Sequence, residues 1–313
     1  VSGSFDDLRA RDMRFLQEAA RLGNAHVLLW TDDAVRARTG KPPRFPLAER
    51  RYLLEAVRYV TRVIPVSEPE GAGARWDMPE GGRRIWVEEE NHADPFRRDW
   101  CQQHGIEYGV LPAAQLEGFP EPPPAPSPPG RKRVVVTGCY DWLHSGHVRF
   151  FEEVSAYGDL YVIVGHDANI RLLKGEGHPL LPETERRYAV GSIRYVKQAL
   201  ISSGEGWLDA DPEIRRLKPD IYAVNEDGDK GGKREYCRAL GLEYLVLKRV
   251  PARWGESVYC SQRDIAQLIE RCVAAPASLR FGVFFGLSAN RYNLADISNA
   301  RDLLGYAPQD GYR

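Results

Sequence analysis

The chain has 313 residues, enough for two domains of ordinary size that each bury a core. It is 43% hydrophobic and 28% charged with a formal net charge of −1, so it lacks the basic excess typical of nucleic-acid or membrane-surface binding. No apolar run approaches the roughly 20 residues of a membrane span, no signal segment opens the chain, and the five cysteines form no close pair. We expect a cytoplasmic protein with reduced thiols, no membrane span and no nucleic-acid partner.

A proline-rich segment divides the chain. Proline recurs throughout residues 119–130, which can therefore form neither a helix nor an interior strand, and we expect an extended linker there. The expected domains are residues 1–118, called here the first half, and residues 131–275, called the second half. Residues 276–313 form a C-terminal tail that does not share the pattern of either half.

The first half repeats in the second with a nearly constant offset. The matching segments and residues include Gly3 with Gly138, Arg14-Phe15 with Arg149-Phe150, Asp32 with Asp167, Glu49-Arg50-Arg51-Tyr52 with Glu185-Arg186-Arg187-Tyr188, Arg58-Tyr59-Val60 with Arg194-Tyr195-Val196, and Cys101 with Cys237. Matches sustained over both halves with one inserted residue indicate a duplicated domain. Val1 aligns with Val136, so either residues upstream are missing or the first half fills its first strand position in another way.

The second half alternates strands and helices. We predict strands at 134–137, 160–164, 220–224 and 244–247, and helices at about 146–156, 183–192 and 233–240. This alternation predicts a parallel sheet with helices on both faces. The expected fold is therefore α/β, with two tandem Rossmann-like domains, each built on a parallel five-stranded sheet. Ligands of such folds bind beyond the carboxyl ends of the strands.

The two halves differ most at His144-Ser145-Gly146-His147, where the first half has Arg9-Ala10-Arg11-Asp12. The two histidines are three residues apart at a predicted helix start, so they share one face beside a natural phosphate site. Imidazole groups there can donate hydrogen bonds to a phosphoryl group as charge develops. Asp12 would instead place a carboxylate where a triphosphate must lie, so we predict that the first half is catalytically inactive.

Other polar residues are weaker candidates. Lys174, beside Gly175, can place a point charge on a phosphate, and an ordinary solvated lysine is the alternative. Asp141 and Arg194 have counterparts in the first half, which favours loop bracing over direct catalysis. We interpret Cys101 and Cys237 as small buried hydrophobic residues rather than nucleophiles.

Residues 138–147 resemble the G-x-x-D-x-x-H-x-G-H signature of the cytidylyltransferases, and the likeness extends over most of residues 131–265. It is nearest to the glycerol-3-phosphate and ethanolamine-phosphate enzymes, the latter with two tandem domains. The resemblance implies transfer of CMP from CTP to a small phosphorylated acceptor, with Mg²⁺ on the triphosphate and release of pyrophosphate. It also implies an intramolecular pseudo-dimer of the two halves and leaves a homo-oligomer as an alternative.

The resemblance carries over to particular residues. The expected catalytic residues are His144, His147 and Lys174, and no protein ligand to a metal is expected. The expected nucleotide-binding residues are Gly138, Cys139, Tyr140, Asp141, Gly146, Arg194, Asn225, Glu226, Asp227 and Ser261. One departure is the hydroxyl-rich segment that ends the family's site, because residues 253–263 keep a serine and an arginine but lose the run of hydroxyl groups.

Three alternatives stay open. ATP-using adenylyltransferases share the histidine motif, and the broken hydroxyl run also suits a non-catalytic nucleotide-binding or regulatory protein. Residues 288–308 resemble the end of the epimerase/dehydratase and uronate dehydrogenase families, with a short capped helix stopped by Gly305. The glycine-rich loop and the Tyr-x-x-x-Lys pair of those enzymes do not occur in the sequence, so an independent dehydrogenase is not expected. The sequence does not identify the acceptor.

Overall fold

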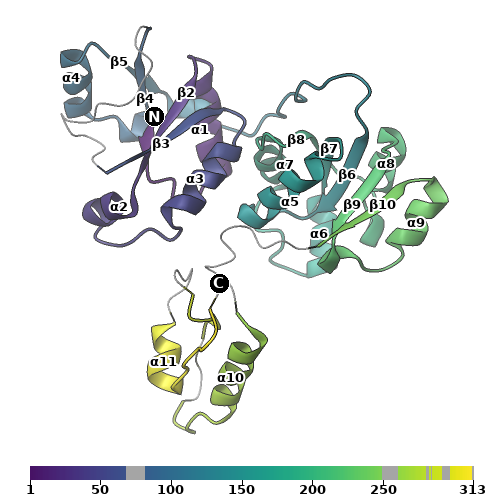
Figure 1. Cartoon of the computed structure of the whole chain (residues 1–313). Helices are drawn as coiled ribbons and strands as arrows, with labels where there is room; N and C mark the ends of the chain where they lie inside the picture. The colour runs from purple at the N-terminus through teal and green to yellow at the C-terminus, as the bar shows by residue number, and fades with distance from the viewer. Residues whose placement is uncertain (68–81, 249–259, 280–281, 283, 291–296, 312–313) are drawn as a thin grey trace.

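The computed structural model describes residues 1–67, 82–248, 260–279, 282, 284–290 and 297–311. A five-stranded, wholly parallel sheet of order β10-β9-β6-β7-β8 forms the second half (Figure 1). Its strands are β6 (Arg133–Gly138), β7 (Asp159–Val164), β8 (Val196–Ile201), β9 (Ile221–Asn225) and β10 (Glu243–Leu247). This confirms the α/β parallel sheet predicted for residues 131–275.

Helices cover both faces of this sheet because neighbouring strand residues point to opposite sides. Val134 and Val136 pack in one core and Val135 in another. Tyr188 contributes to the first core, and Cys237 is buried in the second, as predicted. The helices are α5 (Ser145–Ser155), α6 (Asp167–Lys174), α7 (Glu183–Gly191), α8 (Asp211–Leu217) and α9 (Lys233–Leu240), with short 3₁₀ turns at Gly206–Leu208 and Glu226–Gly228.

The first half contains the same kinds of element in two smaller parallel sheets. One sheet has the order β1-β2-β3 and the other pairs β4 with β5. The strands are β1 (Ser2–Gly3), β2 (Ala25–Trp30), β3 (Val60–Val66), β4 (Ile85–Glu89) and β5 (Glu107–Leu111). The helices are α1 (Ala10–Ala20), α2 (Asp32–Thr39), α3 (Leu47–Ala56) and α4 (Pro95–Gln103), with 3₁₀ turns at Glu90–His92 and Ala113–Leu116.

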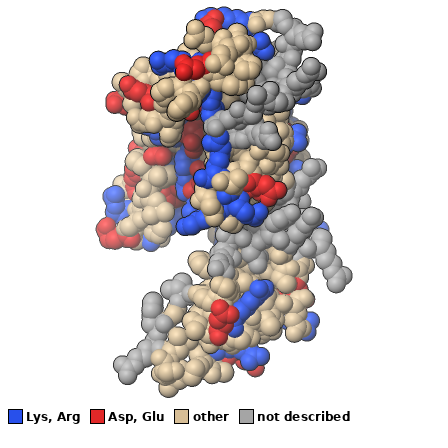
Figure 2. All heavy atoms as spheres, turned by 90° about the vertical axis from the view of Figure 1, so that its left-hand side faces the viewer, with Lys and Arg blue, Asp and Glu red and all other residues tan. Residues whose placement is uncertain are grey.

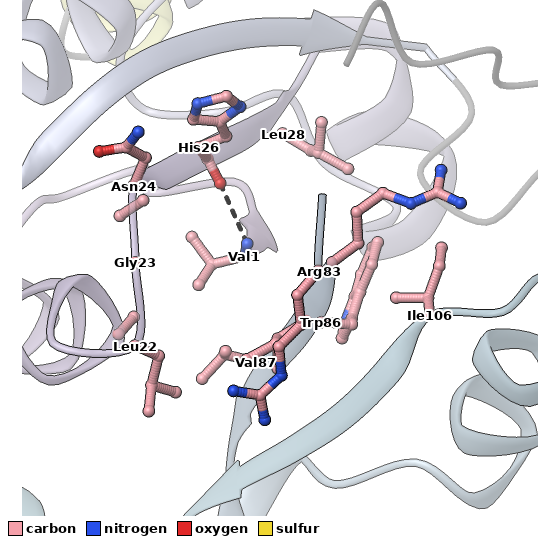
Figure 3. Close-up of a pocket in the computed structure, with 14 residues that line it drawn as sticks. Val1, Leu22, Gly23, Asn24, His26, Leu28, Arg83, Trp86, Val87 and Ile106 are labelled. Atoms are coloured by element: carbon pink, nitrogen blue, oxygen red, sulfur yellow. Dashed lines mark hydrogen bonds between the residues drawn. The ribbon is translucent and has the colours of Figure 1, made fainter. Parts of the chain in front are cut away.

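The prediction of a five-stranded sheet in the first half is therefore wrong for the described residues. In the second half β6 pairs with β9 through Val134 and Val135. In the described part of the first half, β1 consists of Ser2 and Gly3 and pairs with β2, and no strand pairing joins it to β4 or β5. A cavity of about 170 Å³ lies there between β2 and β4, lined by residues that include Val1, His26 and Trp86 (Figure 3). Side-chain packing, rather than strand pairing, joins β4 to the remainder of the first half.

The proline-rich linker packs on the second half. The N–H of Ala125 donates to the carbonyl of Lys197 on β8 at 2.8 Å, and Phe119 lies against Tyr188 with ring centroids 5.5 Å apart. Gly191 accommodates this packing, because a Cβ added there would come within 3.0 Å of Pro122. The linker is thus an ordered, extended part of the molecule.

The two halves share one hydrophobic core, and their contacts are related by exchange of equivalent residues. The N–H of Arg58 donates to the carbonyl of Ser192 at 2.9 Å, and the N–H of Arg194 donates to the carbonyl of Ala56 at the same distance. Tyr52 donates to Glu152, and its counterpart Tyr188 donates to Gln17. These paired contacts give the interface an approximate two-fold symmetry.

Two further helices, α10 (Gln262–Val273) and α11 (Ser298–Leu304), pack against each other and lie apart from the large sheet (Figure 1). Asp264, fully buried at the start of α10, accepts hydrogen bonds from Ser288 and from the N–H groups of Gln309 and Asp310. The packing groups α10 with the tail, so the boundary proposed at residue 275 cuts across a shared core.

The surface is mixed in charge. Figure 2 shows acidic and basic side chains interspersed over the face of the molecule that carries the first half. Within the described part of the chain, no helix has the length and apolar character needed to cross a membrane.

Candidate active site

A tight loop joins β6 to α5 at the carboxyl edge of the large sheet. Tyr140 adopts a left-handed backbone conformation with φ of 53°, and its buried ring folds back over Gly138. A Cβ at Gly138 would lie 2.8 Å from that ring, so a larger residue at the end of the strand would force the ring to move. The Tyr140 ring also contacts His147 edge-on, with centroids 5.2 Å apart. Tyr140, and Gly138 beneath its ring, were both expected in the site, and Tyr140 packs against the histidine motif.

The two histidines meet at the start of α5. Their ring centroids are 4.0 Å apart. His144 is the N-cap residue, and its Nδ1 accepts a hydrogen bond from the N–H of Gly146 at 3.1 Å. A Cβ at Gly146 would lie 2.8 Å from Cε1 of His144, so the glycine leaves room for the capping imidazole. The helix start places two imidazoles together where its N–H groups favour an anion.

Arg186 and Asp141 fix the loops around this edge. Arg186 is fully buried and donates to the carbonyl of Cys139 at 2.6 Å, to the carbonyl of Leu181 at 2.8 Å and to Asp167 at 2.6 Å. Asp141 accepts hydrogen bonds from the N–H groups of Leu180 and Leu181. Burial would raise the pKa of Asp141, but these hydrogen bonds outweigh it and hold the pKa below its usual value. Asp141 braces a loop in this structure.

The remaining expected residues of the sheet edge lie on neighbouring elements. Lys174 is the last residue of α6 and is exposed. Asn225 ends β9, the strand beside β6, and Glu226 and Asp227 follow it as exposed residues. Because the strands are parallel, Asn225 and Gly138 end at the same edge of the sheet.

Two expected nucleotide-binding residues lie elsewhere. Arg194 donates to the carbonyls of Val57 and Val60 in the first half, at 3.0 and 2.8 Å. Ser261 caps α10 by accepting a hydrogen bond from the N–H of Asp264, and its hydroxyl donates to Asp310 in the tail. The structure does not bring these two side chains to the histidine pair. Residues 253–259, which belong to the departing hydroxyl segment, fall outside the described residues.

One contact at the motif comes from the first half. The hydroxyl of Ser145, between the two histidines, donates to Oε1 of Glu49 on α3 at 2.9 Å, and both side chains are buried. Burial raises the pKa of Glu49 to about 7, although the Ser145 hydrogen bond opposes this shift. Glu49 has a counterpart, Glu185, in the second half and belongs to no motif, so the sequence alone does not single it out.

The corresponding helix start in the first half has different chemistry. Asp12 accepts a hydrogen bond from the N–H of Arg9 at 2.7 Å and so satisfies the start of α1. Burial raises the pKa of Asp12, and this hydrogen bond opposes the shift. The Arg9 guanidinium lies 5.8 Å from the ring centroid of Trp142, so the two helix starts face one region of the interface.

Comparison with known proteins agrees with this geometry. Residues 135–262 match the cytidylyltransferase-like family model. An FAD synthase of Ferroglobus placidus is 36% identical over 150 residues, which cover 47% of this chain and 91% of that protein. The chain belongs to the cytidylyltransferase-like family.

Two further relatives match the same part of the fold to different extents. An FAD synthase of Methanospirillum hungatei is 43% identical over 140 residues, covering 44% of this chain and 85% of that protein. The bifunctional protein HldE of Aliarcobacter butzleri is 33% identical over 125 residues, covering 40% of this chain and 25% of that protein. The chain is thus an enzyme of the nucleotidyltransferase kind, and its cytidylyltransferase-like part contains the histidine pair.

Proposed function

We propose that the second half transfers an adenylyl group from ATP to a phosphomonoester and releases pyrophosphate. The observation that carries this proposal is the pair His144 and His147 at the start of α5, with ring centroids 4.0 Å apart at the carboxyl edge of a parallel sheet. Imidazole N–H groups in such a position stabilise the charge that develops on a transferring phosphoryl group.

The relatives favour ATP over the CTP that the resemblance in the sequence suggests. Several of them are named FAD synthase. FAD is the anhydride of AMP and flavin mononucleotide, so an enzyme that makes it from the latter must add an adenylyl group. Flavin mononucleotide is therefore the first acceptor to test, with ATP as the donor.

In the proposed reaction an acceptor phosphate oxygen attacks the α-phosphorus of ATP. A new P–O bond forms as the bond to the bridging oxygen breaks, and its electron pair leaves with pyrophosphate. Nδ1 of His144 accepts from Gly146, so we assign the proton of the neutral ring to Nε2, which can donate to a phosphoryl oxygen. Lys174 would neutralise phosphate charge as a mobile ammonium group. Mg²⁺ would enter with the triphosphate and neutralise its oxygens.

The same reasoning makes the first half a non-catalytic partner. Asp12 takes the place of His147 there. A carboxylate about 4 Å from a phosphate charge is repelled by about 4 kcal/mol at an effective dielectric constant near 20. We propose that the first half serves instead as a built-in packing partner, and a purified chain whose halves make no contact in solution would contradict this.

The test is pyrophosphate release by the full chain with Mg²⁺ and either ATP or CTP. The acceptors are flavin mononucleotide, glycerol 3-phosphate and ethanolamine phosphate, and His147→Ala is the control. We expect turnover with ATP and flavin mononucleotide that the control loses. Turnover with CTP alone would contradict adenylyl transfer and favour cytidylyl transfer. Nucleotide binding without pyrophosphate release would favour a regulatory protein.

A further inference from the structure

The hydrogen bond from Ser145 to Glu49 joins the histidine motif to the other half of the molecule. Glu49 is 5% exposed and Ser145 is 6% exposed, and Oγ of Ser145 lies 2.9 Å from Oε1 of Glu49. Ser145 is the first residue of α5 and follows the capping residue His144 directly. A buried hydroxyl without an acceptor is costly, so this bond favours one placement of the first turn of α5.

The approximate two-fold symmetry provides an internal comparison. Glu185 on α7 is the counterpart of Glu49, and Ala10 is the counterpart of Ser145. Alanine has no hydroxyl group, so Glu185 cannot receive the equivalent hydrogen bond. Glutamate is present on both sides of the interface, but the serine is present only where the two histidines are.

Small displacements of this turn would reach both imidazoles. His144 caps the turn through Gly146, and His147 is one helical turn further along, packed against Tyr140. Catalytic groups must be held to within about 0.5 Å, and a displacement of about 1 Å can reduce a rate by about 100-fold. A residue that holds Ser145 therefore acts on the geometry of the histidine pair.

We propose that Glu49 of the first half is a positioning residue for the reaction in the second half, acting through Ser145 on the first turn of α5. This inference rests on the proposed nucleotidyl transfer, and it gives the first half a defined contribution to the site. The first half is then required for full activity although it lacks the histidines.

The kinetic test compares Glu49→Ala, Glu49→Gln and Glu185→Ala in the full chain, with kcat and the KM for ATP measured separately. Removing the acceptor should lower kcat about tenfold and leave the KM within about twofold, because ground-state binding does not need the exact placement that the transition state needs. Glutamine keeps an amide oxygen that can accept from Ser145, so Glu49→Gln should restore most of kcat. Glu185→Ala, the matched control in the same interface, should stay within about twofold of the wild type.

Combining Glu49→Ala with Ser145→Ala tests whether Glu49 acts through Ser145. In Ser145→Ala the hydroxyl is gone, so adding Glu49→Ala should cause no further loss of kcat. Equal losses in Glu49→Ala and Glu185→Ala, or a full additional loss in the Ser145→Ala background, would overturn the proposal. A Glu49→Gln variant as slow as Glu49→Ala would overturn it too, since the acceptor oxygen would then not be the feature that matters.

An activity-independent measurement separates this inference from the proposed function. The imidazole signals of His144 and His147 in NMR spectra of the full chain should shift in Glu49→Ala and return towards the wild type in Glu49→Gln. Unchanged signals would overturn the positioning role even in an active enzyme. If the wild type shows no turnover but Glu49→Ala still shifts these signals, the proposed reaction is contradicted and the positioning role stands.

Discussion

The starts of α1 and α5 occupy equivalent positions in the two halves. They differ in the side chain that accepts a hydrogen bond from the backbone N–H groups there. At α1 the carboxylate of Asp12 accepts from the backbone of Arg9, and at α5 the imidazole of His144 accepts from the backbone of Gly146. Both helices are capped, so both halves keep the local fold. Only α5 combines its cap with a second imidazole and with a glycine that leaves space beside it. The comparison separates residues that hold the scaffold from residues that can act on a phosphate.

The scaffold itself is nearly the same in both halves. Arg50 donates to the carbonyls of Phe45 and Ser4 and to Asp32, and Arg186 donates to the carbonyls of Leu181 and Cys139 and to Asp167. Both arginine side chains are fully buried. Features kept in the half without histidines therefore serve the fold, and this supports a bracing role for their counterparts in the second half.

The largest effect should come from removing these arginines. Arg50→Met would leave three carbonyls, of Phe45, Ser4 and Trp30, and one carboxylate without their partner. Arg186→Met would leave two carbonyls and one carboxylate without theirs. We expect each change to lower the free energy of unfolding by about 3–5 kcal/mol. Urea denaturation of the full chain measures this. Arg51→Met is the control, because Arg51 pairs with Glu55 on the surface and should cost less than about 1 kcal/mol. A large loss for one buried arginine alone would break the equivalence of the two scaffolds.

The next effect distinguishes the two helix starts by activity. His147→Ala should lower kcat by about 100- to 1000-fold, because it removes a donor to the transition state. Asp12→Ala, at the equivalent position, should leave kcat unchanged and destabilise α1 by about 1 kcal/mol through loss of the cap. Steady-state rates and thermal unfolding of both variants provide the comparison. A comparable loss of kcat in Asp12→Ala would give the first half a chemical role.

Local pattern was enough to predict most of the second half. The β-branched run at Val134–Val136, with Gly138 after it, corresponds to β6, and the histidine spacing correctly placed both rings on one face of α5. The exceptions are the strand β8, where Lys197 and Gln198 interrupt the apolar pattern, and the short helices α6 and α8, which were not predicted. The spacing of apolar residues shows which side of a single segment is buried, and in the predicted segments the buried sides face the cores of the sheet.

Contacts between distant segments could not be predicted in this way. Glu49 and Ser145 are 96 positions apart in the chain, and nothing local marks either as a partner of the other. Arg194 was expected at the nucleotide, but its long side chain reaches carbonyls of the first half across the interface. Ser261 was expected at the same site, and its N-cap role at α10 satisfies its hydroxyl within the tail. Serine and arginine can either bind a nucleotide or form hydrogen bonds within the protein, so the surrounding structure decides which role each has.

A smaller effect tests the space beside the capping imidazole. Gly146→Ala would place a Cβ 2.8 Å from Cε1 of His144, so the ring must move and its hydrogen bond to the N–H of Gly146 must weaken. We expect kcat to fall about tenfold while the chain stays folded. The first half has Arg11 at this position, so Arg11→Ala serves as the control and should not change kcat. Normal activity in Gly146→Ala would show that the cap does not set the position of His144.

The last effect concerns how stability depends on pH at the contact between the halves. Burial raises the pKa of Glu49 from 4.5 to about 7 in the folded chain. Between these two values the folded state binds a proton that the unfolded state has released, so the contribution of Glu49 to stability falls as pH rises from about 4.5 to about 7 and is constant outside that window. Glutamine cannot ionise, so the free energy of unfolding of Glu49→Gln relative to the wild type should rise across the same window. Urea denaturation at several pH values measures the difference, with Glu55→Gln as an exposed control on the same helix. A difference that does not vary with pH would mean that Glu49 has the same proton affinity in both states, and the contact would then hold Ser145 without any cost of burying its charge.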